Sequence, residues 1–313
     1  MFIEQGIKKD NEFWRYILGS LAVILATFIG QVPLGIVVFA KAFKASNIPT
    51  TQEDLMKYLN SNLSLFLMLL SFAFAFGALY FVIKYFHRQT FLSVTTARAK
   101  VDWSRIIFSF GIWSLFTIIT TIAVFYFEPG KLIWNFKPIP FFILMLISIV
   151  MIPIQTTTEE YIFRGYLMQG FGNLAKNRWF PLLMTSVIFG GMHYFNPEVA
   201  KMGNLIMVYY IGTGLFLGIL TLMDDGLELA LGFHAANNLI GALLVTSEWT
   251  VLQTHSIFKD VSEPSLGFDI LFPVLIVFPC VLVVFSNKYQ WTNWKEKLTG
   301  KITSNESNIL KNE

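Results

Sequence analysis

Residues 141–173 read FFILMLISIVMIPIQTTTEEYIFRGYLMQGFGN, and the first part of this stretch is almost entirely apolar. A helix needs about 20 predominantly apolar residues to cross the hydrocarbon core of a bilayer. The same stretch also carries Glu159, Glu160 and Arg164. Ionisable groups are costly inside a membrane. Where such a group has an identifiable interaction partner, it marks a functional position. We therefore interpret 141–173 as a membrane-spanning helix that carries functional polar groups.

Seven further apolar segments accompany this one, so the sequence predicts about eight transmembrane helices. They lie at residues 17–39, 63–86, 106–127, 179–195, 205–223, 227–245 and 270–285. The composition agrees with this reading, because 55% of the residues are hydrophobic and only 14% are charged, whereas a soluble domain is about 25% charged. The expected fold class is an all-α polytopic membrane protein, and residues 1–313 are expected to form one integral membrane domain.

Several classes of protein are excluded by the same numbers. A soluble fold of this length could not bury so much apolar surface, and the mean hydropathy is +0.58. The single cysteine, Cys280, cannot form an internal disulfide, so it indicates no redox compartment. The net charge of +3 is small and scattered, which argues against a nucleic-acid partner. The partner that the composition does predict is the lipid bilayer.

The positively charged residues predict how the chain crosses the membrane. With an even number of spans both termini lie on one side, and 16 of the 23 Lys and Arg residues fall on that side. Loops rich in Lys and Arg stay in the cytoplasm. We therefore expect a multi-pass protein of the cell membrane with both termini cytoplasmic.

Three polar clusters interrupt the apolar spans. Their sequences are EEYIFR at 159–164, FGGMH at 189–193 and HAANN at 234–238. With one helix running to about Leu174 and the next starting near Arg178, Glu159 lies fifteen residues before the polar turn and His193 lies fifteen residues after it. At about 1.5 Å per residue both are roughly 22 Å along antiparallel helices, so they should share one depth. His234 enters from the same side, and the three clusters are therefore expected to meet inside the membrane.

Helical spacing predicts contacts within these clusters. Glu160 and Arg164 are four residues apart and share a helix face, so an ion pair with a supporting role is expected. Gly190 and Gly191 remove side chains near the following histidine, which allows a backbone or a substrate to approach closely.

The three clusters together resemble a known family, the type II CAAX prenyl endopeptidases and their bacterial relatives, the CPBP or Abi family of intramembrane proteases. The family is marked by EExxxR, FxxxH and HxxxN in this order. The corresponding positions are Glu159-Glu160-x-x-x-Arg164, Phe189-x-x-x-His193 and His234-x-x-x-Asn238. No motif position departs from the family pattern, and the resemblance covers roughly residues 141–245, the expected catalytic core.

The resemblance implies catalytic roles for four residues. Glu159 and His193 resemble the pair that activates water, and His234 and Asn238 resemble the groups that hold the oxyanion. The implied function is an intramembrane endopeptidase that acts on membrane-associated peptides or proteins, whether of CAAX type or bacterial. The chemistry is reasonable because hydrolysis of a peptide bond needs an activated water and a stabilised oxyanion.

A zinc-dependent mechanism is the main alternative. Glu159, His193 and His234 form a two-histidine, one-carboxylate set, which matches the ligand types of a catalytic zinc site. The sequence contains no HExxH pair that would preform such a site. Asn238, on the same helix face as His234, is a poor zinc ligand but a good hydrogen-bond donor. We therefore expect water activation by Glu159 and His193 without an obligatory metal.

Two functions of other classes stay open at this point. A bacteriocin-immunity or membrane-assembly factor could keep the same fold without catalysis. A transporter could place polar groups at mid-membrane, but it would more often show inverted repeats or paired broken helices, and the sequence has neither.

Overall fold

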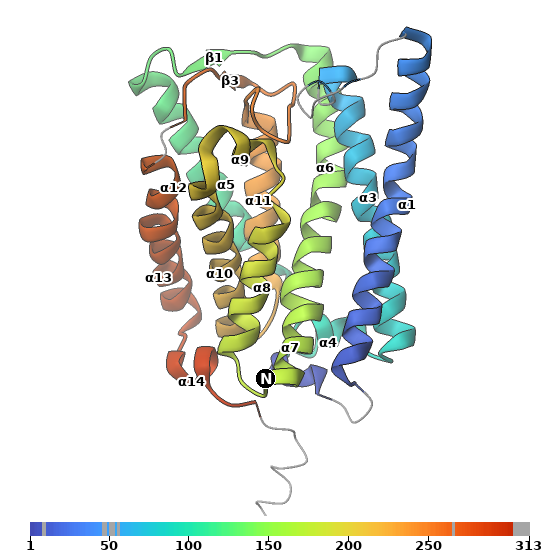
Figure 1. Cartoon of the computed structure of the whole chain (residues 1–313). Coiled ribbons are helices and arrows are strands. Elements are labelled where there is room, and N and C mark those ends of the chain that lie inside the picture. Colours follow the sequence, from blue (N-terminus) through green and yellow to red (C-terminus); the bar gives the residue numbers. More distant parts are fainter. Residues whose placement is uncertain (8–10, 46–48, 50–53, 55–56, 265–266, 303–313) are drawn as a thin grey trace, which may run out of the picture.

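The computed structural model describes the chain except for residues 8–10, 46–48, 50–53, 55–56, 265–266 and 303–313. Helices dominate it, and the long ones run side by side as a bundle, with α1 at one edge and α12 and α13 at the opposite edge (Figure 1). Six helical segments of the described chain are long and apolar enough to cross a bilayer. The expected all-α polytopic membrane fold is thereby confirmed.

The helices and strands follow one another along the chain with short connections. The helices are α1 (Phe13–Ala45), α3 (Ser61–Phe81), α4 (Phe91–Thr95), α5 (Trp103–Phe127), α6 (Pro138–Glu160), α7 (Met168–Ala175), α8 (Trp179–Met192), α9 (Pro197–Met202), α10 (Ile206–Asp224), α11 (Glu228–Leu244), α12 (Phe268–Phe272), α13 (Phe278–Tyr289) and α14 (Trp294–Thr299). The strands are β1 (Leu132–Trp134), β2 (Val245–Thr246) and β3 (Phe258–Asp260). Short 3₁₀ turns lie at Ile3–Gly6 and Gly203–Leu205, and π-helical stretches lie at Val82–Phe86, Tyr161–Leu167 and Pro273–Val277.

Six of the eight expected spans therefore correspond to helices of sufficient length. The other two are shorter than the sequence predicted, because α8 has 14 residues and α11 has 17. At about 1.5 Å per residue they are roughly 21 Å and 25 Å long, which is less than the thickness of about 30 Å of a bilayer core. The motif residue His193 follows the end of α8 directly, and α11 contains His234 and Asn238. These polar residues limit the apolar length of both helices.

The side chains of the bundle are distributed as expected for a protein surrounded by lipid. Large apolar side chains point outwards from α1, where Phe28 is 68% exposed and Phe39 is 72% exposed. Polar side chains of α6, among them Thr156 and Thr158, are fully buried. A soluble protein avoids exposed apolar patches of this extent, so the outer surface fits contact with lipid.

Both described ends of the chain lie at the same end of the bundle (Figure 1). The backbone N–H of Phe2 donates to Asp225 in the turn between α10 and α11, and Lys297 of α14 forms an ion pair with the same aspartate at 2.8 Å. An isolated β-bridge joins Asn177, in the turn between α7 and α8, to Lys301. We call the end of the bundle that holds these contacts and both described chain ends the terminal end.

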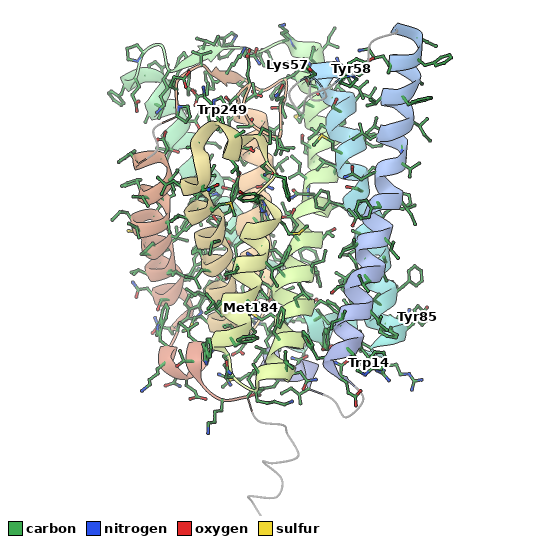
Figure 2. All side chains as sticks on the ribbon, in the orientation of Figure 1. Trp14, Lys57, Tyr58, Tyr85, Met184 and Trp249 are labelled. Atoms are coloured by element: carbon green, nitrogen blue, oxygen red, sulfur yellow. The ribbon has the colours of Figure 1, made fainter. Side chains whose placement is uncertain are left out.

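The opposite end of the bundle carries the only strands of the described chain. They form a small sheet in the order β1-β3-β2, with β1 antiparallel and β2 parallel to β3. The sequence did not predict this sheet. Figure 2 shows Tyr58 and Trp249 near this end and Trp14 and Tyr85 near the terminal end. Tyr and Trp are enriched where a membrane meets water, so the two sets fit the two interfaces.

Candidate active site

The two neighbouring glutamates stand at the end of α6, where the helix passes into a π-helical stretch. Glu160 is the last residue of α6, and Tyr161–Leu167 follows with the wider π geometry before α7 begins. Single π turns inside α-helices occur frequently at functional sites. Apolar spacing alone does not reveal such a turn, so the sequence predicted only a continuous helix.

Glu160 and Arg164 form the ion pair that their spacing predicted. Their side chains are fully buried and the Arg164 Nη1–Glu160 Oε1 distance is 3.0 Å. The guanidinium also donates to the carbonyl oxygen of Gly214 on α10 at 3.3 Å and lies 4.3 Å from the centre of the Phe189 ring. The pair therefore links α6, α8 and α10 in the interior of the bundle.

His234 of α11 lies between the two glutamates. Its Nδ1 is 2.7 Å from Glu160 Oε1. Because a carboxylate accepts, Nδ1 carries a hydrogen and donates a hydrogen bond to Glu160. Its Nε2 is 3.6 Å from Glu159 Oε2, which is longer than a hydrogen bond. The contact with Glu160 fixes the orientation of the imidazole, and Nε2 is left facing Glu159.

The two carboxylates differ in their access to solvent. The Glu160 side chain is fully buried, whereas the Glu159 side chain keeps 13% of its surface exposed. Of the two carboxylates, only Glu159 therefore has surface that a water molecule could contact. Glu160, held by Arg164 and His234, is placed to orient these two groups.

His193 lies directly after the last residue of α8, at the point where this short helix ends. Its Nδ1 lies 2.8 Å from the carbonyl oxygen of Phe189, one turn earlier, and its ring stacks on Tyr210 of α10 at 4.5 Å. A carbonyl can only accept, so Nδ1 donates and the neutral ring keeps Nε2 as an acceptor. The Phe189 ring lies 4.8 Å from His193 and 6.2 Å from His234. The three motifs thus gather around Phe189, as expected.

Asn238 has a partner that the sequence did not predict. It donates to the side-chain oxygen of Gln155 at 3.1 Å, and Gln155 in turn donates to Glu159 Oε1 at 2.7 Å. Gln155 stands four residues before Glu159 on α6. A glutamine in an apolar span, one turn from a candidate base, was a signal that could have identified it.

The residues present do not fit a metal site. Within the described part of the chain, no group of three His, Cys, Asp or Glu side chains lies close enough to hold a metal ion. The hydrogen bonds of both motif histidines leave Nε2 of each ring free, so the absence of such a group rests on the spacing of the described side chains and not on occupied nitrogens. The site therefore has to act through its own side chains.

Comparison with known proteins agrees with the motifs. Residues 138–240 match the model of the Rce1-like type II CAAX prenyl endopeptidase family, which confirms the resemblance. The chain is also similar to the uncharacterized protein YyaK of Bacillus subtilis (strain 168), with 29% identity over 294 residues that cover 93% of this chain and 96% of that protein. No solved structure matches the chain. At the level of the family, the chain is therefore similar to membrane-embedded endopeptidases.

Proposed function

We propose that this protein is an intramembrane endopeptidase that hydrolyses peptide bonds of membrane-associated substrates with a water molecule activated by Glu159 and His193. The observation that carries the proposal is the difference between the two glutamates. Glu159 is accessible, whereas its neighbour is buried and occupied by Arg164 and His234. A general base must reach the proton that it abstracts, and Glu159 is the carboxylate of the site that can do so.

The side chains of the site can activate the water, stabilise the oxyanion and protonate the leaving group. Glu159 takes a proton from water as the water oxygen bonds to the scissile carbonyl carbon, and His193 accepts a hydrogen bond from the same water through Nε2. His234 in its doubly protonated form, together with the second amide proton of Asn238, donates to the resulting oxyanion. Such donors contribute about 3 kcal/mol each to lowering the barrier. The proton held by Glu159 passes to the leaving nitrogen as the C–N bond breaks, which gives a carboxylic acid and an amine. The remaining water proton then passes from the acid to the amine, so the final products are a carboxylate and a protonated amine.

The substrate class follows from where the site lies. The motif residues stand on helices that are surrounded by apolar, outward-facing side chains, so a substrate reaches them most readily from the bilayer. A peptide or protein attached to the membrane by a lipid or an apolar segment fits this route. A prenylated CAAX peptide is one such substrate, and a bacterial membrane peptide is another.

Replacement of the proposed base tests the function. We expect Glu159→Gln in the purified, detergent-solubilised protein to lose nearly all turnover while its melting temperature stays unchanged. The substrates are an internally quenched peptide that ends in a farnesylated Cys and three further residues, and the same peptide without the farnesyl group. Cleavage of the farnesylated peptide alone would assign the CAAX class. Full activity of Glu159→Gln would exclude the proposed mechanism and favour a non-catalytic role.

A further inference from the structure

A chain of hydrogen bonds crosses three helices and ends on the proposed base. Trp113 Nε1 of α5 donates to Asn237 Oδ1 at 3.1 Å, and Asn237 Nδ2 donates to Asn238 Oδ1 at 3.0 Å. Asn238 Nδ2 donates to Gln155 Oε1 at 3.1 Å, and Gln155 Nε2 donates to Glu159 Oε1 at 2.7 Å. The motifs and the proposed mechanism account for Glu159 and Asn238 but not for the other three members.

The direction of this chain is imposed at both of its ends. The indole of Trp113 can only donate, so the atom of Asn237 that faces it must be the amide oxygen. Each following amide must then accept on one side and donate on the other. At the far end the ionised carboxylate of Glu159 can only accept, which requires the same direction. Two independent chemical constraints therefore agree on the orientation of all three amides.

Packing keeps the members in place. The Trp113 side chain lies in the core with 7% exposure, and its ring is 4.2 Å from that of Phe233. Gln155 is 8% exposed. Hydrogen bonds in such a low-dielectric interior are stronger than in water, and bonds in a chain polarise one another. A free glutamine side chain could instead turn its carbonyl oxygen towards Glu159, where it would repel the carboxylate.

We propose that Trp113, Asn237 and Asn238 act as positioning residues that orient Gln155, so that Gln155 presents its N–H to Glu159 and holds this carboxylate for catalysis. The chain occupies Oε1 of Glu159 and leaves Oε2 turned towards His234. This inference rests on the proposed role of Glu159 as the base. It assigns Asn238 a role within the protein in addition to contact with the substrate.

The continuity of the chain can be measured without any turnover. Labelling with ¹⁵N-indole tryptophan gives a resonance for each of the eight Trp residues, and Trp113→Phe identifies that of Trp113. We expect Glu159→Gln and Gln155→Leu each to shift the Trp113 N–H resonance, because both weaken the far end of a polarised chain. The internal control is Trp291, a buried indole that donates to Asp224 at 3.3 Å outside the chain, and its resonance should stay in place. An unmoved Trp113 resonance in both variants would overturn the proposal.

Turnover of the farnesylated quenched peptide then tests the positioning role. We expect Gln155→Leu to lower kcat by about 10- to 100-fold, since a misplaced catalytic group costs this much, with KM unchanged. Trp113→Phe should lower kcat less, and its effect should disappear in the Gln155→Leu background, because residues that act through one another are not additive. The matched control, Trp291→Phe, should have the same effect with and without Gln155→Leu.

The outcomes separate this inference from the function on which it rests. An active Glu159→Gln protein would refute the proposed function. An inactive Glu159→Gln protein together with full activity of Gln155→Leu would leave the function intact and overturn the positioning role. Additive losses for Trp113→Phe and Gln155→Leu would likewise reduce Trp113 to a packing residue.

Discussion

Glu159 and Glu160 are adjacent in the sequence but occupy different environments. Successive helical positions point in different directions, so Glu160 faces Arg164 and His234 in the closed interior, whereas Glu159 faces Gln155 and keeps some exposure. The same residue type can then serve two purposes in one motif. In the proposed mechanism the buried glutamate orders its neighbours, and the accessible one exchanges a proton with water.

The buried ion pair gives the first prediction at the scale of residues. Arg164→Ala leaves the Glu160 carboxylate without its cationic partner in a fully buried position. Breaking a buried pair in this way costs about 3–5 kcal/mol, so we expect less folded protein and a lower melting temperature in detergent. The double variant Glu160→Gln with Arg164→Met removes both charges and should recover part of the loss. A melting temperature of Arg164→Ala equal to that of the unmodified protein would contradict this role.

Metal removal gives a second prediction at this scale. Among the described residues, no three His, Cys, Asp or Glu side chains lie close enough together to hold a metal ion. We therefore expect prolonged treatment with a strong chelator to leave peptide cleavage unchanged. Loss of cleavage that added zinc restores, with stoichiometric metal in the active sample, would instead establish a metalloprotease.

At the scale of elements, the short helix α8 packs closely against α10 at Gly190, and also where Gly214 and Gly218 of α10 face it. A Cβ atom at Gly190 would lie 2.4 Å from the Cγ1 atom of Ile211 and 3.0 Å from its backbone nitrogen. At Gly191 a Cβ atom would meet nothing within 4 Å. The sequence grouped these two glycines, whereas the structure gives only the first a packing role. His193 lies three residues after Gly190, at the end of α8. The packing at Gly190 therefore also sets the position of that histidine.

These glycines form a matched pair for mutation. Gly190→Ala must push α8 away from the α10 backbone, and overpacking of this kind costs about 1–3 kcal/mol. We expect a lower melting temperature and reduced cleavage. Gly191→Ala should be neutral or slightly stabilising, because alanine favours a helix over glycine by up to about 1 kcal/mol. Equal behaviour of the two variants in thermal unfolding would show that contact between α8 and α10 does not determine the position of His193.

The elements also show what the sequence could and could not predict. The turn near Asn173 was placed within about a residue, because apolar runs and polar turn residues are local signals. The meeting of the three motifs followed from counting helical rise from that turn. The π-helical stretch after Glu160, the small sheet and the chain through Gln155 were not predicted. The sheet and the contacts of Asn238 and Trp113 depend on segments far apart in the sequence, which a single sequence does not reveal. The spacing of Gln155 and Glu159 is local and could have been noticed.

On the scale of the whole molecule, charged residues concentrate at the terminal end of the bundle. Arg98 forms ion pairs with Asp224 at 3.0 Å and with Glu228 at 3.2 Å, and Arg105 also pairs with Asp224. Glu228 is the first residue of α11, so these contacts fasten the start of the helix that carries His234. The position of the proposed site therefore depends on the folding of the terminal end as well as on the membrane-embedded core.

The orientation of the whole bundle in the membrane is the last prediction. The terminal end carries most of the Lys and Arg residues, although Lys8, Lys9 and Lys311, which contribute to that bias, lie outside the described residues, and Arg164 is buried in the bundle. Cytoplasmic loops are the ones enriched in these residues. We therefore expect the terminal end in the cytoplasm and the small sheet on the opposite side of the cell membrane.

The single native cysteine makes this orientation measurable. Cys280→Ala removes the only thiol, and a new cysteine can then replace Lys100, an exposed residue of the terminal end, or Glu263, whose side chain is 85% exposed near the opposite end. In intact cells, a membrane-impermeant maleimide should label Glu263→Cys, whereas Lys100→Cys should react only after the cells are permeabilised. Labelling of Lys100→Cys in intact cells, with Glu263→Cys protected, would reverse the predicted orientation. The reversed result would also place the turn between α7 and α8, from which the depths of Glu159 and His193 are counted, on the outer side of the membrane.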